Sequence, residues 1–215
     1  IKNPLESQPG GGGEKHTLEV AEFLRDQGHN VYFAGSCKHL NKMAAEASFP
    51  VEKINFAGTE AVSEMSILKF FFTWPSVKKH YQNFLSKQKR QRNIDTLYLL
   101  SWNEKFLLTP IAKKLRMKVF FVEHRLLERY IRLNPFRGWY GHGTKYAKVL
   151  AVSEAVKKTA LEVGVPAGQI QVIANGVDAT VLDKYYSQGK VERGLIGAAG
   201  RLSSEKGLDI LLRAF

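Results

Sequence analysis

Cysteine is almost absent from this sequence of 215 residues, in which Cys37 stands alone. A single cysteine excludes an internal disulfide and any zinc site built on several cysteines. Long apolar runs are missing too, because no stretch of about 18 hydrophobic residues occurs that could cross a membrane. Aspartate is scarce, and no two of the five aspartates stand two positions apart, so no D-x-D carboxylate pair exists for a metal ion. We therefore expect no metal, and a cytoplasmic setting.

Two common phosphate-binding motifs are also missing, although glycines fill residues 10–13 just before the first expected helix. Starting G-x-G-x-x-G at Gly10 or Gly11 puts Lys15 or His16 where the third glycine belongs. A P-loop fails because no Gly-Lys-Ser/Thr triplet occurs. Residues without a Cβ still let a backbone approach a bulky ligand. Taken alone, the glycines fit a ligand-binding loop and a flexible loop equally well.

Helical spacings and apolar runs alternate along most of the chain, and no internal repeat is visible. The expected helices cover residues 14–27, 103–116 and 153–163, and the expected strands cover residues 31–35, 51–56, 96–101, 118–122, 149–152 and 170–173. Strands separated by helices predict an α/β fold with a doubly wound parallel sheet. Residues 1–4 are short and polar for the strand that usually precedes such glycines, so we expect further sequence at both ends.

The last residues predict the beginning of a second domain. The apolar run at residues 194–199 is typical of a buried strand, and the apolar spacing after Lys206 indicates a helix. Arg201 and Lys206 would then lie on a strand-to-helix turn, where a diphosphate can bind, although both also fit as solvated surface charges. Residues 179–193 are polar and Tyr-rich, like a connection. We place the first domain at residues 1–190 and the second at 191–215.

Several motifs in this order resemble the glycosyltransferases of family 4, which are retaining enzymes of the GT-B fold. They are GGGEKH (11–16) with GHNV (28–31), VSEAV (152–156) with GVP (164–166), VIANGVD (172–178), and GRLSSEKG (200–207). The resemblance covers nearly the whole chain except residues 57–92. It implies that the predicted sheet is the Rossmann-like first domain of a GT-B enzyme, followed by a truncated second domain.

The resemblance also implies roles for individual residues. Gly12 and Gly13 match the loop that faces the donor's diphosphate and sugar, while Arg201 and Lys206 match the basic pair that holds the diphosphate. His124, which follows the expected strand at 118–122, matches a histidine near the reacting sugar and is the candidate catalytic residue. The nucleotide-sugar is a substrate, so no cofactor is implied.

The family's acidic motif, two glutamates separated by seven residues, does not occur in the second domain of this sequence. We therefore expect these 215 residues alone to be inactive.

Positive charge is unevenly distributed within the net charge of +12. Between Glu64 and Asp95 there are seven Lys/Arg and no acidic residue, with aromatic residues at helical spacing. This basic amphipathic stretch, including Lys78 and Lys79, fits contact with the inner face of an anionic membrane, or a helix that covers the sheet with a solvated basic face. A second basic cluster, including Arg125 and Arg129, fits an acceptor's phosphates or a solvated surface equally well.

Three functions are compatible with the sequence. The first is transfer of a sugar from a nucleotide-sugar to a glycan or lipid-linked acceptor, in cell-surface polysaccharide or lipopolysaccharide-type biosynthesis. The second is a non-catalytic module of the same fold that binds an acceptor or a membrane. The third, nucleic-acid binding, is allowed by the basic charge, but no recognised motif supports it and we expect no nucleic-acid partner.

Overall fold

The structure of the chain is a computed structural model. It describes residues 1–2, 11–54, 64–127, 131, 134–176, 179–180, 183, 194, 196–200, 202 and 206–214. The chain divides into two units, Ile1–Gly176 and Val177–Phe215. The predicted domain boundary near residue 190 falls outside the described residues and stays a prediction.

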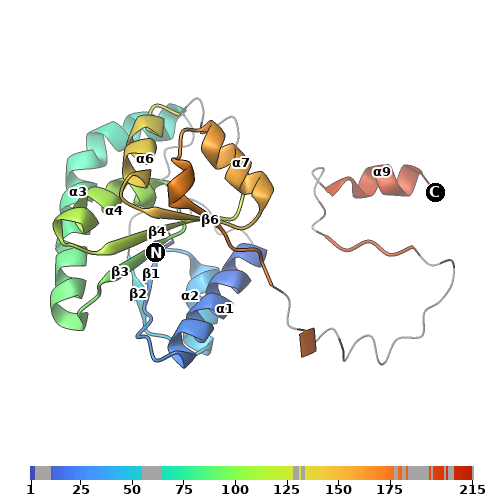
Figure 1. Cartoon of the computed structure of the whole chain (residues 1–215), viewed down its shortest axis with the longest axis horizontal. Helices are drawn as coiled ribbons and strands as arrows, with labels where there is room; N and C mark the ends of the chain where they lie inside the picture. The colour runs from blue at the N-terminus through green and yellow to red at the C-terminus, as the bar shows by residue number, and fades with distance from the viewer. Residues whose placement is uncertain are drawn as a thin grey trace. The chain divides into compact units, whose positions relative to one another are not determined.

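Parallel strands form the centre of the first unit (Figure 1). One pair consists of β1 (Phe33–Gly35) and β2 (Val51–Lys53). Four more strands follow in the spatial order β3 (Thr96–Leu99), β4 (Lys118–Glu123), β5 (Lys148–Ala151) and β6 (Ile170–Val172). The structure therefore confirms the α/β fold with a parallel sheet.

Ile1 and Lys2 connect the two sets of strands. Lys2 forms a parallel bridge with Gly35, and its N–H donates to the Ala34 carbonyl at 3.2 Å. On the other side, the Leu100 N–H donates to the Ile1 carbonyl at 3.1 Å. We expected residues 1–4 to be too short and polar for a strand, and the first two form no named strand. Their backbone hydrogen bonds nevertheless bridge the two groups of strands.

The spatial order is thus β2, β1, residues 1–2, β3, β4, β5, β6. It reverses between residues 1–2 and β3, and in doubly wound sheets ligands bind at the carboxyl ends of the strands beside such a reversal.

Helices cover both faces of this sheet (Figure 1). On one face lie α1 (Gly12–Asp26) and α2 (Lys38–Glu46). On the other face lie α3 (Glu64–Arg92), α4 (Trp102–Lys114), α6 (Arg137–Thr144) and α7 (Glu154–Glu162). A short 3₁₀ turn, η1 (Ala167–Gln169), precedes β6.

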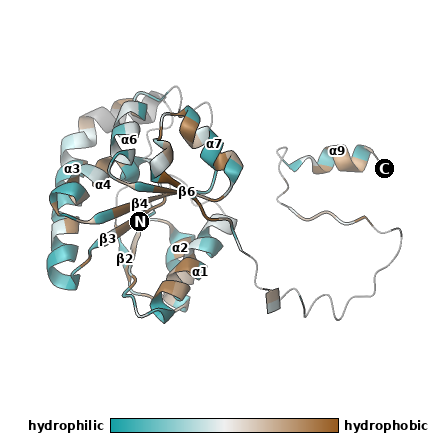
Figure 2. Cartoon of the chain, viewed as in Figure 1, coloured by the Kyte–Doolittle hydropathy of each residue, from teal (hydrophilic) through white to brown (hydrophobic). Residues whose placement is uncertain are grey.

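Two hydrophobic cores hold the layers together. The larger core includes Leu99, Leu108, Phe121, Tyr140 and Val149, all fully buried around β3, β4 and β5. The smaller core lies around β1 and α2, and its buried members are Ala21, Phe33, Cys37, Leu40, Ala44 and Phe49. Figure 2 shows hydrophobic residues on β4 and β6.

One face of the helix α3 is buried in the core and the opposite face is exposed to solvent. Val77, Tyr81 and Leu85 are buried, at the i, i+4, i+8 spacing of one helix face, whereas Lys78 and Lys79 are exposed. The C-terminal half of α3 is therefore a helix that covers the core with a basic outer face. No helix in the described part of the chain is long and apolar enough to cross a membrane.

The described residues of the second unit include one helix, α9 (Leu208–Arg213), which begins after Gly207 in the left-handed conformation (φ 62°). A helix after Lys206 was predicted and is confirmed. The predicted strand at 194–199 is not formed by described residues 196–199. A strand requires a hydrogen-bonded neighbour, and no strand pairing involves the described residues of this unit.

Candidate active site

The site lies at the beginning of α1, where the glycines end. Gly11 is the N-cap, and α1 starts at Gly12. The Glu14 carboxylate accepts a hydrogen bond from the Gly11 N–H at 3.0 Å and also pairs with the Lys2 ammonium. Partial burial works to raise the pKa of Glu14, but the hydrogen bonds from Lys2 and Gly11 outweigh it and hold the pKa below its ordinary value. An ionised Glu14 thereby fixes the glycine segment to the first residues of the sheet.

Gly13 contacts His124, so two residues predicted to share a site do come together. His124 follows directly after β4, and a Cβ added to Gly13 would lie 3.3 Å from the His124 Cγ and Cδ2 atoms. That separation is tighter than nine in ten real Cβ contacts. Glycine at position 13 therefore lets α1 approach the end of β4 closely enough for the imidazole to lie against its backbone.

A second histidine completes this arrangement. The His16 ring from α1 meets the His124 ring edge-on, with the centroids 5.2 Å apart and an interplanar angle of 78°. Both ring nitrogens of His124 and the Nδ1 atom of His16 are buried and find no hydrogen-bond partner among the described residues. Most buried polar atoms in proteins are hydrogen-bonded to protein or to ordered water, so these three nitrogens are candidates to bind a hydroxyl group.

The surroundings of His124 keep its ring neutral. Burial is the largest of the effects that lower the pKa of His124 to about 4, followed by electrostatic interaction with His16, Lys105 and Lys2, against a weaker opposing effect from Glu14. At neutral pH the imidazole therefore carries one N–H donor and one nitrogen acceptor. A neutral ring with this pair of groups suits a hydroxyl group, which both donates and accepts.

A buried polar network lies behind His124. The Lys105 ammonium, on α4, donates to the Val122 carbonyl and to the Glu123 Oε1 atom, both at 2.8 Å. The Tyr140 hydroxyl, on α6, donates to the same Glu123 oxygen at 2.8 Å. The side chains of Lys105 and Glu123 are only 2% and 7% exposed. These contacts fix the last two residues of β4, immediately before His124.

The structure describes only some of the other predicted site residues. A Cβ on Gly12 would meet no described atom within 4 Å, unlike one on Gly13. Arg125 is exposed, and Arg129 and Arg201 lie outside the described residues. Lys206 is described in the second unit, where it is exposed and precedes α9.

Sequence reasoning gave no role to His16, Lys105 or Glu123. His16 had a usable signal, because it follows the glycines by one helical turn. Lys105 had none, since a lysine among apolar residues of a helix is ordinarily assigned to its solvent side. No group of three or more His, Cys, Asp or Glu that could hold a metal ion occurs within the described ranges.

Comparisons with known proteins give a family and a set of similar folds. The family model described as Glycosyltransferase Family 4 matches residues 10–181. The fold is similar to that of a glycosyltransferase from Rickettsia africae, with 22% sequence identity and a TM-score of 0.60, over 80% of this chain and 42% of that chain. No curated protein sequence matches the chain.

A second similar structure is Anabaena HepE. Its complex with UDP has 17% identity and a TM-score of 0.58, over 83% of this chain and 44% of that chain. Its complex with UDP-glucose has 17% identity and a TM-score of 0.52, with the same coverage. This chain thus spans less than half the length of these relatives. Because the family model covers most of the sequence and the fold agrees, the chain belongs to glycosyltransferase family 4, with a first unit of the Rossmann-like GT-B type.

Proposed function

We propose that the protein transfers a sugar from a nucleotide-sugar to a glycan or lipid-linked acceptor in cell-surface polysaccharide or lipopolysaccharide-type biosynthesis. The anomeric configuration of the sugar is retained in this proposal. The observation that carries it is the contact between Gly13 and a neutral His124 whose buried ring nitrogens find no partner among the described residues. Family membership supplies the reaction class.

The chemistry assigns different tasks to the two units. When the bond between the sugar and the nucleotide breaks, negative charge grows on the leaving diphosphate. In our proposal Arg201 and Lys206 of the second unit stabilise that charge. His124 binds a hydroxyl of the transferring sugar. Because the cations are amino-acid side chains, the proposed reaction requires no metal ion.

UDP-sugars are the first donors to test. Anabaena HepE has been crystallised with UDP and with UDP-glucose, and its fold resembles this one. At 17% identity this likeness concerns the fold alone, so the binding experiment described below identifies the donor.

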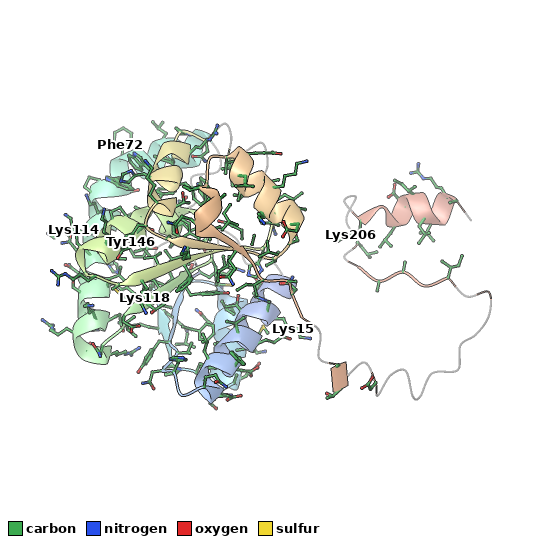
Figure 3. All side chains as sticks on the ribbon, in the orientation of Figure 1. Lys15, Phe72, Lys114, Lys118, Tyr146 and Lys206 are labelled. Carbon is green, nitrogen blue, oxygen red and sulfur yellow. The ribbon has the colours of Figure 1, made fainter. Side chains whose placement is uncertain are left out.

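An anionic membrane is the proposed second partner. Leu68 and Phe72 on α3 are 56% and 80% exposed, and Figure 3 shows Phe72 pointing away from the helix. Lys79 follows Phe72 by seven residues and therefore lies along the same helix face. Beside them, the rings of Trp74 and the exposed Trp139 of α6 are 4.7 Å apart. Apolar side chains next to lysines suit an interface with anionic lipid, where a lipid-linked acceptor would be found.

The test uses the full-length protein and a panel of UDP-, GDP- and ADP-sugars. Thermal stabilisation by one nucleotide class, lost in the Arg201→Ala/Lys206→Ala variant, would support donor binding at the proposed diphosphate site. Release of the nucleotide upon addition of acceptor membranes would support transfer. If no donor stabilises the full-length protein while it still binds vesicles, the non-catalytic binding module becomes the better description.

A further inference from the structure

The ion pair between Lys105 and Glu123 is unusual in its depth. Both side chains are almost fully buried, and Tyr140 donates a further hydrogen bond to the same carboxylate. Burying two charges costs desolvation free energy that their attraction does not always repay, so apolar residues of similar size often stabilise a fold equally well. Stability alone is therefore a weak reason for this pair.

Its location suggests a different reason. Three elements contribute to the network: α4 through Lys105, β4 through Val122 and Glu123, and α6 through Tyr140. All of the contacts converge on the two residues that precede His124. The backbone there is held further, because the Val152 N–H donates to the Glu123 carbonyl at 3.3 Å. The position of the imidazole follows directly from the position of this strand end.

We infer that Lys105, Glu123 and Tyr140 are positioning residues, which hold His124 against Gly13 in the orientation needed for sugar transfer. This inference rests on the proposed function, since it assigns a task to residues that touch no substrate. A shift of about 1 Å in a substrate-positioning group is enough to slow an enzyme about 100-fold. The network therefore has a function beyond stability.

The charge of Lys105 also acts on His124. The charged and titratable groups around the imidazole are His16 and Glu14 from α1, Lys2 from the first residues, and Lys105 from α4. Lys105 lowers the pKa of His124, after burial and His16. Removing this charge should therefore raise that pKa.

The chain contains a matched control for the kinetic test. The Tyr81 hydroxyl donates to the buried Glu104 carboxylate at 2.7 Å, and Glu104 stands beside Lys105 on α4. Tyr81→Phe and Tyr140→Phe therefore each remove one buried tyrosine–carboxylate hydrogen bond of nearly equal length. Only Tyr140 bonds to the residue before His124.

We expect both tyrosine variants of the full-length protein to lose similar thermal stability. In Tyr140→Phe, kcat should fall about 10-fold while KM for the nucleotide-sugar changes less than about twofold. In Tyr81→Phe, both constants should stay near the wild-type values. Equal kcat values in the two variants would overturn the inference.

A second measurement does not depend on activity. Titration of ¹⁵N-labelled histidine by NMR gives the pKa of His124 in the wild type and in Lys105→Met. We expect the pKa of His124 to be higher in Lys105→Met, and an unchanged titration with unchanged ring resonances would overturn the inference. If Lys105→Met does not fold, the His124 ring resonances are compared in Tyr140→Phe and Tyr81→Phe instead. We expect them to move only in Tyr140→Phe, and unmoved resonances in both variants would overturn the inference. Absence of any transfer by the wild type would instead refute the proposed function.

Discussion

Replacing Gly13 with alanine isolates the contact on which the site depends. The added methyl group would lie 3.3 Å from two atoms of the His124 ring, so the ring or the helix must move by a few tenths of an ångström. Overpacking of this kind costs about 1–3 kcal/mol. Alanine also favours helix over glycine by up to about 1 kcal/mol, so we expect a net loss of about 0–2 kcal/mol.

Gly12→Ala is the matched control, because Gly12 is the preceding residue of the same helix. Its new methyl group would meet no described atom within 4 Å, so only the helix gain remains. We expect Gly12→Ala to equal or exceed the wild type in stability. The two variants should therefore differ by about 1–3 kcal/mol, which is about 2–4 °C in Tm for each kcal/mol in a domain of this size.

Chemical denaturation and NMR of the His124 ring together check this prediction. Gly13→Ala should move the His124 resonances, whereas Gly12→Ala should leave them in place. Equal stability of the two variants, with unmoved resonances in both, would refute the reasoning that glycine is required by the approach of α1 to His124.

Three further predictions concern pH, membrane and metal. The folded pKa of His124, about 4, lies below the ordinary histidine value of about 6.5, so the folded state binds fewer protons. The stability that the neutral His124 contributes is therefore fully present above about pH 6.5 and is lost as the pH falls toward 4. Urea denaturation at several pH values should show that the free energy of unfolding falls less steeply with acid in His124→Gln than in the wild type. Identical pH dependence in the two proteins would contradict this prediction. Phe72→Ser should weaken binding to anionic vesicles about 10-fold, judged from the apolar area of one phenylalanine. Phe23→Ser is the control, because it removes a 63% exposed phenylalanine from α1 on the opposite face of the sheet, and it should leave vesicle binding unchanged. EDTA should leave the rate of sugar transfer unchanged, because cationic side chains replace the metal in the proposed reaction; a loss of activity restored by a divalent cation would exclude that mechanism.

The elements that the sequence predicts well are those whose signals are local. The helix α7 begins after Ser153, whose hydroxyl accepts a hydrogen bond from the Val156 N–H at 3.2 Å, and the predicted range differs from the observed one by only one residue at each end. The strand β4 was predicted from its apolar run, which also placed His124 at a strand end. Period and capping are properties of a few neighbouring residues, so the sequence reveals them directly.

The helix α6 was missed because its own sequence opposes it. It contains Gly138, Gly141 and Gly143, each a poor helix former. A Cβ on Gly143 would lie 3.2 Å from the Phe121 ring, so the close packing of α6 against β4 requires glycine there. Tertiary contacts decide this helix, and a local pattern does not contain them.

The candidate site divides in the same way. Gly13 and His124 could be paired from their resemblance to family motifs, and the structure brings them into contact. The partners of Lys105 come from β4 and α6, far apart along the chain, so no spacing in the sequence predicts the network. The assigned roles of Arg201 and Arg129 stay predictions, since both residues lie outside the described ranges.

The two hydrophobic cores meet at the site. Gly13 lies in the first turn of the helix whose Ala21 is buried in the smaller core, whereas His124 follows the strand whose Phe121 is buried in the larger one. Across the sheet, backbone hydrogen bonds of Ile1 and Lys2 join the two groups of strands. The contact of Gly13 with His124 thus links an element packed in one core to an element packed in the other. A substitution that disturbs the packing of either core would therefore reach the imidazole, through α1 from one face of the sheet or through β4 from the other.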